Sequence, residues 1–141
     1  MIFIILAMIF YSIAIVFGAA AARHTNSTLS AAVTNLISAI IPLVAVVPLI
    51  GKKTISSQRL GIFFAAMCGV AVAVFVIAIN KAYAHNKVGI VAPMVFGGAI
   101  FLSTTLSYFI FKEKVSAVQS FGLLLLALGL GVVTFARATG R

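Results

Sequence analysis

Five long apolar runs, separated by short polar segments, make up the pattern of hydrophobic and polar positions along the chain. The runs are Met1–Ala22, Leu29–Ile50, Leu60–Ile79, Val88–Phe111 and Val115–Ala136. A helix rises about 1.5 Å per residue, so roughly 20 apolar residues cross the ~30 Å hydrocarbon core of a bilayer. None of the runs shows the strict alternation of a membrane barrel strand. The pattern predicts an all-α membrane protein with five transmembrane helices in a single domain over residues 1–141.

The composition excludes a soluble enzyme and a soluble nucleic-acid-binding protein. Hydrophobic residues make up 64% of the chain and charged residues only 8%, whereas a soluble domain carries about a quarter charged residues. The single cysteine, Cys68, cannot form a disulfide within the chain, and His24 and His85 are too far apart in sequence for a metal-ligand motif. With no aspartate in the chain, no Ser/His/Asp site can be assembled. We therefore expect no catalytic residues, no metal, no cofactor and no nucleic-acid partner.

The basic residues do not favour one side of the membrane. Lys/Arg excess in short loops normally sets the orientation of a membrane protein. The N-terminus and the second and fourth loops carry five of the ten basic residues, which are Lys52, Lys53, Arg59, Lys112 and Lys114. The opposite side carries the other five, which are Arg23, Lys81, Lys87, Arg137 and Arg141. Either a partner fixes the orientation, or the even split of so few charges is due to chance, or the chain inserts both ways. In the last case it forms an antiparallel pair, as in transporters built from inverted repeats.

Polar and small residues share one face in three of the apolar runs. An unsatisfied polar group in hydrocarbon costs several kcal/mol by general estimate, so such faces are expected to meet protein or a cavity. Asn35 is the most informative, because its amide needs both donors and acceptors near mid-membrane. Serine and threonine also bond back to their own helix, and small residues also pack helices, so a structural role stays open. The candidate substrate-pathway residues are Tyr11, Asn35, Ser38, Thr104 and Tyr108.

Three further features concern the ends of the runs and the last run. Lys81 and His85 follow the third run and could extend to the interface or attract an anionic headgroup or substrate. Glu113, the only acid, lies between two lysines, and we expect it to be a solvated loop ion. Gly122 and Gly129 are spaced to allow close backbone approach, which predicts that the last run packs at a dimer interface.

The last sixty residues carry a more specific pattern. The segment AINKAYAHNKVGIVAPM leads into a helix that ends in FKEKVS, residues 111–116, and the final helix begins with Gln119 and Gly122. This pattern resembles the drug/metabolite transporter superfamily, specifically a single five-helix EamA-type unit. The resemblance covers the whole chain in helix count and is specific over residues 78–135.

The resemblance implies a transporter of small organic molecules or metabolites that works by alternating access. Many members have ten helices in two inverted halves, and this chain looks like one half. The implied partners are a second copy in a homodimer, antiparallel in the case of dual insertion, or a sister five-helix chain, in a bacterial-type inner (plasma) membrane. The first run lacks the embedded glutamate of the related small multidrug resistance proteins, which argues against their proton/cation antiport. The alternatives are a flippase subunit for lipid-linked sugars and a non-transporting membrane assembly subunit.

Overall fold

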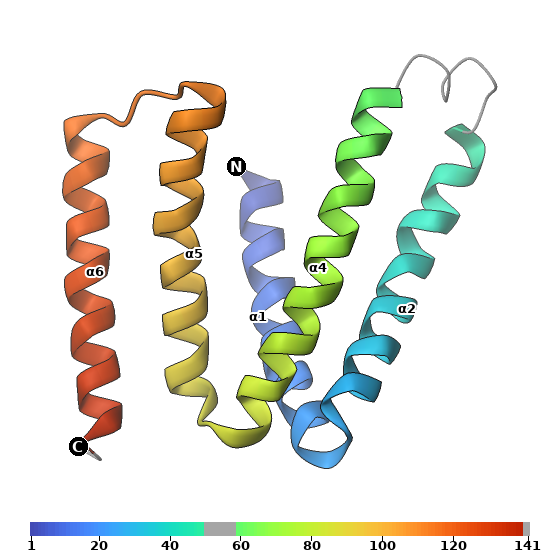
Figure 1. Ribbon diagram of the computed structural model, residues 1–141, viewed down its shortest axis with the longest axis horizontal. Helices are drawn as coiled ribbons and strands as arrows, with labels where there is room; N and C mark the ends of the chain where they lie inside the picture. Colours follow the sequence, from blue (N-terminus) through green and yellow to red (C-terminus); the bar gives the residue numbers. More distant parts are fainter. Residues whose placement is uncertain (50–58, 140–141) are drawn as a thin grey trace. The chain divides into compact units, whose positions relative to one another are not determined.

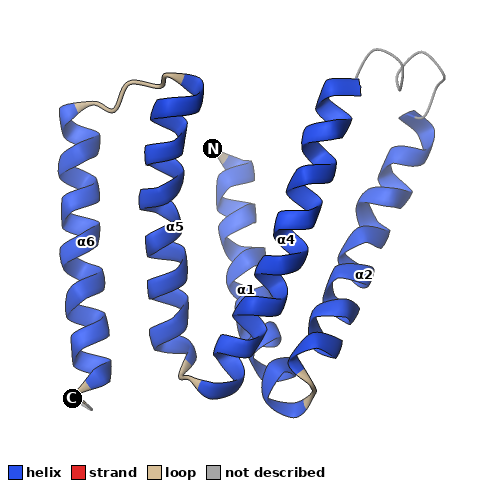
Figure 2. Ribbon diagram, in the orientation of Figure 1, coloured by secondary structure: helices blue, strands red, loops and turns tan. Residues whose placement is uncertain are grey.

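The computed structural model describes residues 1–49 and 59–139, and its regular elements there are all helical (Figures 1 and 2). The elements are α1 (Ile2–His24), α2 (Ser27–Val46), the short 3-10 helix η1 (Val47–Leu49), α4 (Arg59–His85), α5 (Val88–Phe111) and α6 (Ala117–Ala138). The five longer helices are each long and apolar enough to cross a membrane. The prediction of an all-α protein with five spans is therefore confirmed.

The third span extends further than the apolar run predicted. We expected it to end at Ile79, but α4 continues to His85 and leaves only Asn86 and Lys87 between it and α5. The predicted run ended at Ile79 because the next residue, Asn80, is polar. That residue lies inside the protein, where a polar side chain with a partner does not end a helix.

The second span ends in two steps. Pro42 stays within α2, the regular helix ends at Val46, and η1 continues to Leu49. The predicted end at Ile50 and the basic residues Lys52 and Lys53 lie outside the described residues.

Side chains from the loops hold the starts of two helices. The first amides of a helix have no partner within it, and a side-chain oxygen just before the helix commonly accepts from them. The Oδ1 atom of Asn26 accepts from the backbone N–H of Thr28 at 2.9 Å and of Leu29 at 3.4 Å. Ser116 and Gln119 cap α6 reciprocally, each side chain accepting from the other residue's backbone N–H. The two polar loops therefore fix where α2 and α6 begin.

Helices α1, α2 and α4 form one compact unit, residues Met1–His85. Its buried residues gather at one end, where α1 finishes, α2 starts and α4 finishes. They are Ala19, Ala22, Ser30, Ala31, Ile79, Asn80 and Tyr83. Four of the seven are alanine or serine, and such small side chains let membrane helices approach closely. The tightest packing of this unit is therefore near one membrane surface.

Helices α5 and α6 form the second unit, which begins at Asn86. They meet at Gly97, which is buried, and a β-carbon placed there would overlap the side chain of Leu130. A β-carbon at Gly122 or Gly129 would meet nothing within 4 Å. The close contact between α5 and α6 therefore uses Gly97, whereas Gly122 and Gly129 on α6 have open space beside them.

Most of the apolar surface faces outward. At most 11% of the residues in each spanning window are buried, and large side chains such as Phe3, Phe17 and Leu128 are exposed. Apolar surface on this scale is not stable in water. Lipid or another chain must therefore cover these helices.

Candidate functional site

A buried polar contact joins α2 and α4. The Nδ2 atom of Asn80 donates to Oγ of Ser30 at 3.4 Å, and the two residues are only 3% and 4% exposed. Helix α1 closes the contact at Gly18, where a β-carbon would lie 3.9 Å from Oδ1 of Asn80. All three helices of the first unit thus meet at an uncharged pair of hydrogen-bonding side chains.

Tyr83 lies one helical turn beyond Asn80 on α4 and is 2% exposed. Its hydroxyl is buried and has no hydrogen-bond partner among the described residues. Residues three apart in a helix share one face, so Tyr83 lies on the same face of α4 as Asn80. Tyr11 on α1, a predicted pathway residue, is exposed. We call Ser30, Asn80 and Tyr83 the buried polar cluster.

A pocket of about 290 Å³ opens beside this cluster, between the end of α1 and the start of α2. It is lined by Ala21, Thr25, Leu29, Ser30, Val33 and Thr34. Ser30 therefore belongs to both the pocket wall and the buried polar cluster. Ser30 and Thr34 are four residues apart and share one face of α2.

The same face of α2 continues to the predicted residue Ser38. Its Oγ donates to the carbonyl of Asn35 at 3.0 Å, so the hydroxyl is bonded to its own helix. The Asn35 side chain is half-buried. Both residues remain predicted pathway residues. The bond of Ser38 to its own helix is the structural role that the sequence had left open for hydroxyl side chains.

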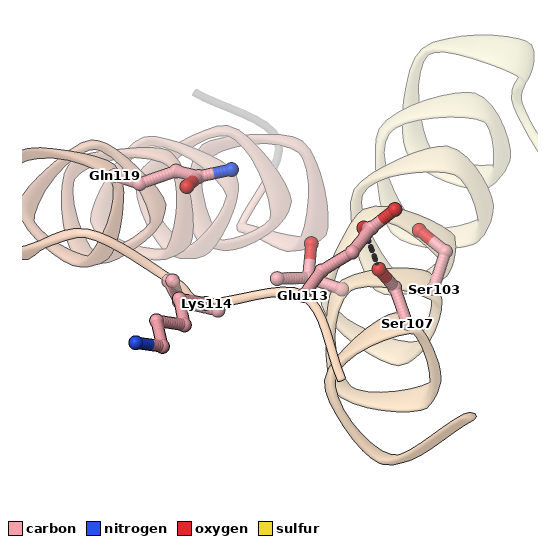
Figure 3. Close-up of a pocket in the computed structure, with 7 residues that line it drawn as sticks. Ser103, Ser107, Glu113, Lys114 and Gln119 are labelled. Carbon is pink, nitrogen blue, oxygen red and sulfur yellow. Dashed lines mark hydrogen bonds between the residues drawn. The ribbon is translucent and has the colours of Figure 1, made fainter. Parts of the chain in front are cut away.

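A second polar pocket, of about 250 Å³, lies within the unit of α5 and α6 (Figure 3). Its lining residues are Ser103, Thr104, Ser107, Glu113, Lys114, Val115 and Gln119. The Oγ atom of Ser107 donates to the carboxylate of Glu113. In Figure 3 the Glu113 side chain reaches toward α5, whereas Lys114 points away from it. Glu113 is exposed, as expected for a loop ion, but it is also bonded to the end of α5.

The predicted pathway residues are divided between the two units. Tyr11, Asn35 and Ser38 belong to the first, and Thr104 and Tyr108 to the second. Thr104 lines the second pocket and donates to the carbonyl of Ile100 at 2.8 Å. The ring of Tyr108 is exposed and meets Phe109 edge-on, with 5.3 Å between ring centroids. A cavity shared by all five stays a prediction.

The predicted anion-contact residues lie at the positively charged end of the first unit. Lys81 and His85 are exposed and one helical turn apart near the end of α4. Arg23 and His24 are in the last turn of α1. The sequence has no acid before Glu113, so no carboxylate of this unit offsets the positive charge. Such a surface attracts anions, and the anion or headgroup role stays a prediction.

Sequence reasoning missed the buried polar cluster and the contact at Gly97. Asn80 was assigned to a loop, although Asn80 and Tyr83 have the three-residue spacing of one helix face. Continuing the helical periodicity beyond Ile79 would have placed both on α4. Gly97 lies within the fourth apolar run, and no signal in the sequence identifies Leu130 as its neighbour.

Comparison with known proteins identifies one family. The model of the EamA-like transporter family matches residues 1–135. No curated protein and no solved structure gives a significant match. The match covers all five membrane-spanning helices as far as residue 135. The chain therefore belongs to the EamA-like transporter family, within the drug/metabolite transporter superfamily.

Proposed function

We propose that this chain is one five-helix half of a transporter that moves small organic molecules or metabolites across a bacterial-type inner membrane by alternating access. The observation that carries the proposal is the family match over residues 1–135 in a chain with five membrane-spanning helices. The family consists of membrane transporters rather than enzymes.

The second half is a second copy of this chain or a sister five-helix chain. Three observations support pairing. The helices expose most of their apolar surface, and α6 has open space beside Gly122 and Gly129. The basic residues are also divided five and five between the two sides. An antiparallel pair would create the inverted symmetry on which alternating access often depends.

The pathway of such a transporter would run along the uncharged polar side chains of the spans. Tyr11, Asn35 and Ser38 in the first unit and Thr104 and Tyr108 in the second are the proposed lining residues. Polar groups at this depth need partners, and a solute or water can supply them.

A lipid-linked sugar flippase is the second candidate, because the positively charged end of the first unit could hold an anionic headgroup. Arg23, His24, Lys81 and His85 form that end. A non-transporting membrane assembly subunit is a third candidate. It would need no water access at Asn35 or Thr104, whereas both transport functions would.

Transport by reconstituted protein tests the proposal. Vesicles that contain the purified chain are incubated with a mixture of soluble metabolites, washed, and their contents compared by mass spectrometry with those of empty vesicles. We expect a defined set of small molecules to accumulate, and Asn35→Leu to reduce their uptake while the protein stays folded. A flippase would instead move labelled lipid-linked sugar between leaflets. Absence of both activities from folded protein of either orientation would contradict the proposal.

A further inference from the structure

We infer that the buried polar cluster, Ser30, Asn80 and Tyr83, is a binding subsite for an uncharged hydrogen-bonding group of the transported solute. The solute would reach the cluster through the pocket between α1 and α2. That the ligand is a transported solute rests on the proposed function, whereas the site rests on the geometry of the cluster and the pocket.

The Tyr83 hydroxyl is the first observation. It is buried in a residue that is 2% exposed, and it has no hydrogen-bond partner among the described residues. Buried polar groups in proteins are almost always hydrogen-bonded, because removal from water without a new partner is unfavourable. Since the described protein groups do not bond this hydroxyl, an external molecule is its expected partner.

Ser30 is the second observation, because it connects the cluster to a space large enough for a ligand. It lines the pocket between α1 and α2, and its Oγ accepts the hydrogen bond from Asn80. A hydroxyl has one donor and two acceptor positions. After accepting from Asn80, Ser30 can still offer hydrogen-bonding capacity to a molecule in the pocket. The Asn80 contact fixes the position from which it does so.

The lining indicates the chemical class of the ligand. No charged side chain is part of the cluster or of the pocket wall, which combines the hydroxyls of Thr25, Ser30 and Thr34 with the apolar side chains of Ala21, Leu29 and Val33. A charged group without a partner would be strongly disfavoured there. The pocket volume of about 290 Å³ is large enough for a small molecule. These features fit the hydroxyl or primary amide of a small metabolite.

A purely structural role is the competing explanation. The Ser30–Asn80 hydrogen bond would hold α2 against α4 in either case, so it does not separate the two explanations. The Tyr83 hydroxyl separates the two explanations. If nothing occupies the cluster, the hydroxyl is unfavourable where it lies, and its removal should raise stability. If water or solute bonds to it, its removal should lower stability.

Thermal unfolding of the full-length chain in detergent tests the inference. Wild type, Tyr83→Phe and the control Ser12→Ala are compared with and without two probes, nicotinamide for a primary amide and myo-inositol for hydroxyls. Ser12 is an exposed residue whose hydroxyl bonds its own helix. We expect Tyr83→Phe to have a lower Tm than wild type. We also expect at least one probe to raise the Tm of wild type and of Ser12→Ala, and to raise that of Tyr83→Phe by much less.

An equal or higher Tm for Tyr83→Phe would overturn the inference. So would the absence of a probe-induced shift in wild type, or shifts of equal size in wild type and Tyr83→Phe. Myo-inositol presented as phosphatidylinositol in mixed micelles distinguishes a lipid headgroup from a free solute, because only one form should stabilise the protein. These measurements do not depend on transport. A chain that binds a probe but moves no solute would contradict the proposed function and support the subsite.

Discussion

Replacing Ser30 by alanine should weaken the attachment of α2 to α4. The substitution removes the acceptor of the 3.4 Å hydrogen bond from Asn80, whose side chain is only 3% exposed. Interhelical hydrogen bonds in membranes contribute ~0.6 kcal/mol on average. A buried donor left without a partner costs a further ~1–3 kcal/mol. Because the bond is long, we use the lower end of that range and expect Ser30→Ala to lower the free energy of unfolding by about 1–2 kcal/mol.

The assay is unfolding by SDS in mixed micelles, followed by far-UV circular dichroism because the chain has no tryptophan. Ser12→Ala is the matched control, since Oγ of Ser12 donates to the carbonyl of Met8 at 2.7 Å and the residue is exposed. Its effect should stay within about 0.5 kcal/mol.

A double-mutant cycle with Asn80→Ala isolates the pair, with an expected coupling of about 1–2 kcal/mol, because both the lost bond and the unpaired donor require Asn80. A coupling of zero, or equal effects of Ser30→Ala and Ser12→Ala, would refute the assignment of this bond as a link between the helices.

Three further predictions concern the helix ends and packing faces. Gly97→Ala should destabilise the chain by about 1–3 kcal/mol in the same SDS assay, because the new methyl group overlaps the facing leucine of α6. The control Gly98→Ala has open space beside it and should be close to neutral. Equal effects of the two substitutions would contradict the contact. Lys112→Gly should raise stability by up to about 1 kcal/mol. Residue 112 adopts a left-handed conformation with φ of 54°, which is unfavourable for residues with a β-carbon. A loss of stability would show that interactions of the lysine side chain outweigh this backbone cost. Gly122→Leu and Gly129→Leu should each reduce the yield of crosslinked dimer by separating the helix backbones, and unchanged yields in both would exclude this face of α6 from a dimer interface.

The helices were predictable because membrane insertion depends on local composition. A single apolar run of about 20 residues crosses lipid as a helix, because only a helix forms all of its backbone hydrogen bonds within one segment. The fifth run was predicted to begin at Val115, two residues before α6 begins at Ala117; Ser116 and Gln119, which have the spacing of a capping box, mark the actual start. The end of α4 was not predictable, because polarity alone cannot distinguish Asn80 in a loop from Asn80 buried against Ser30.

The candidate site was less predictable because it depends on which faces meet. Asn35 and Ser38 were chosen for their polarity and depth, yet the most deeply buried hydrogen-bonding side chains among the described residues are those of Ser30, Asn80 and Tyr83 near the helix ends. The contact between α5 and α6 is of the same kind, because Gly97 on α5 faces Leu130 on α6. These partners are separated by dozens of residues, and one sequence contains no signal that pairs them.

Water access at mid-membrane tests the central claim, a transport pathway through the spans, most directly. In a background without Cys68, a cysteine is placed at position 35 (Asn35→Cys) and, as a control, on the outward apolar face of α6 (Leu128→Cys), where the native leucine is 60% exposed. A hydrophilic, membrane-impermeant thiol reagent is then applied to vesicles that contain each folded variant. A pathway predicts that the Asn35→Cys variant reacts and the Leu128→Cys variant does not. Equal lack of reaction in both variants would contradict a water-accessible pathway and favour a non-transporting assembly subunit.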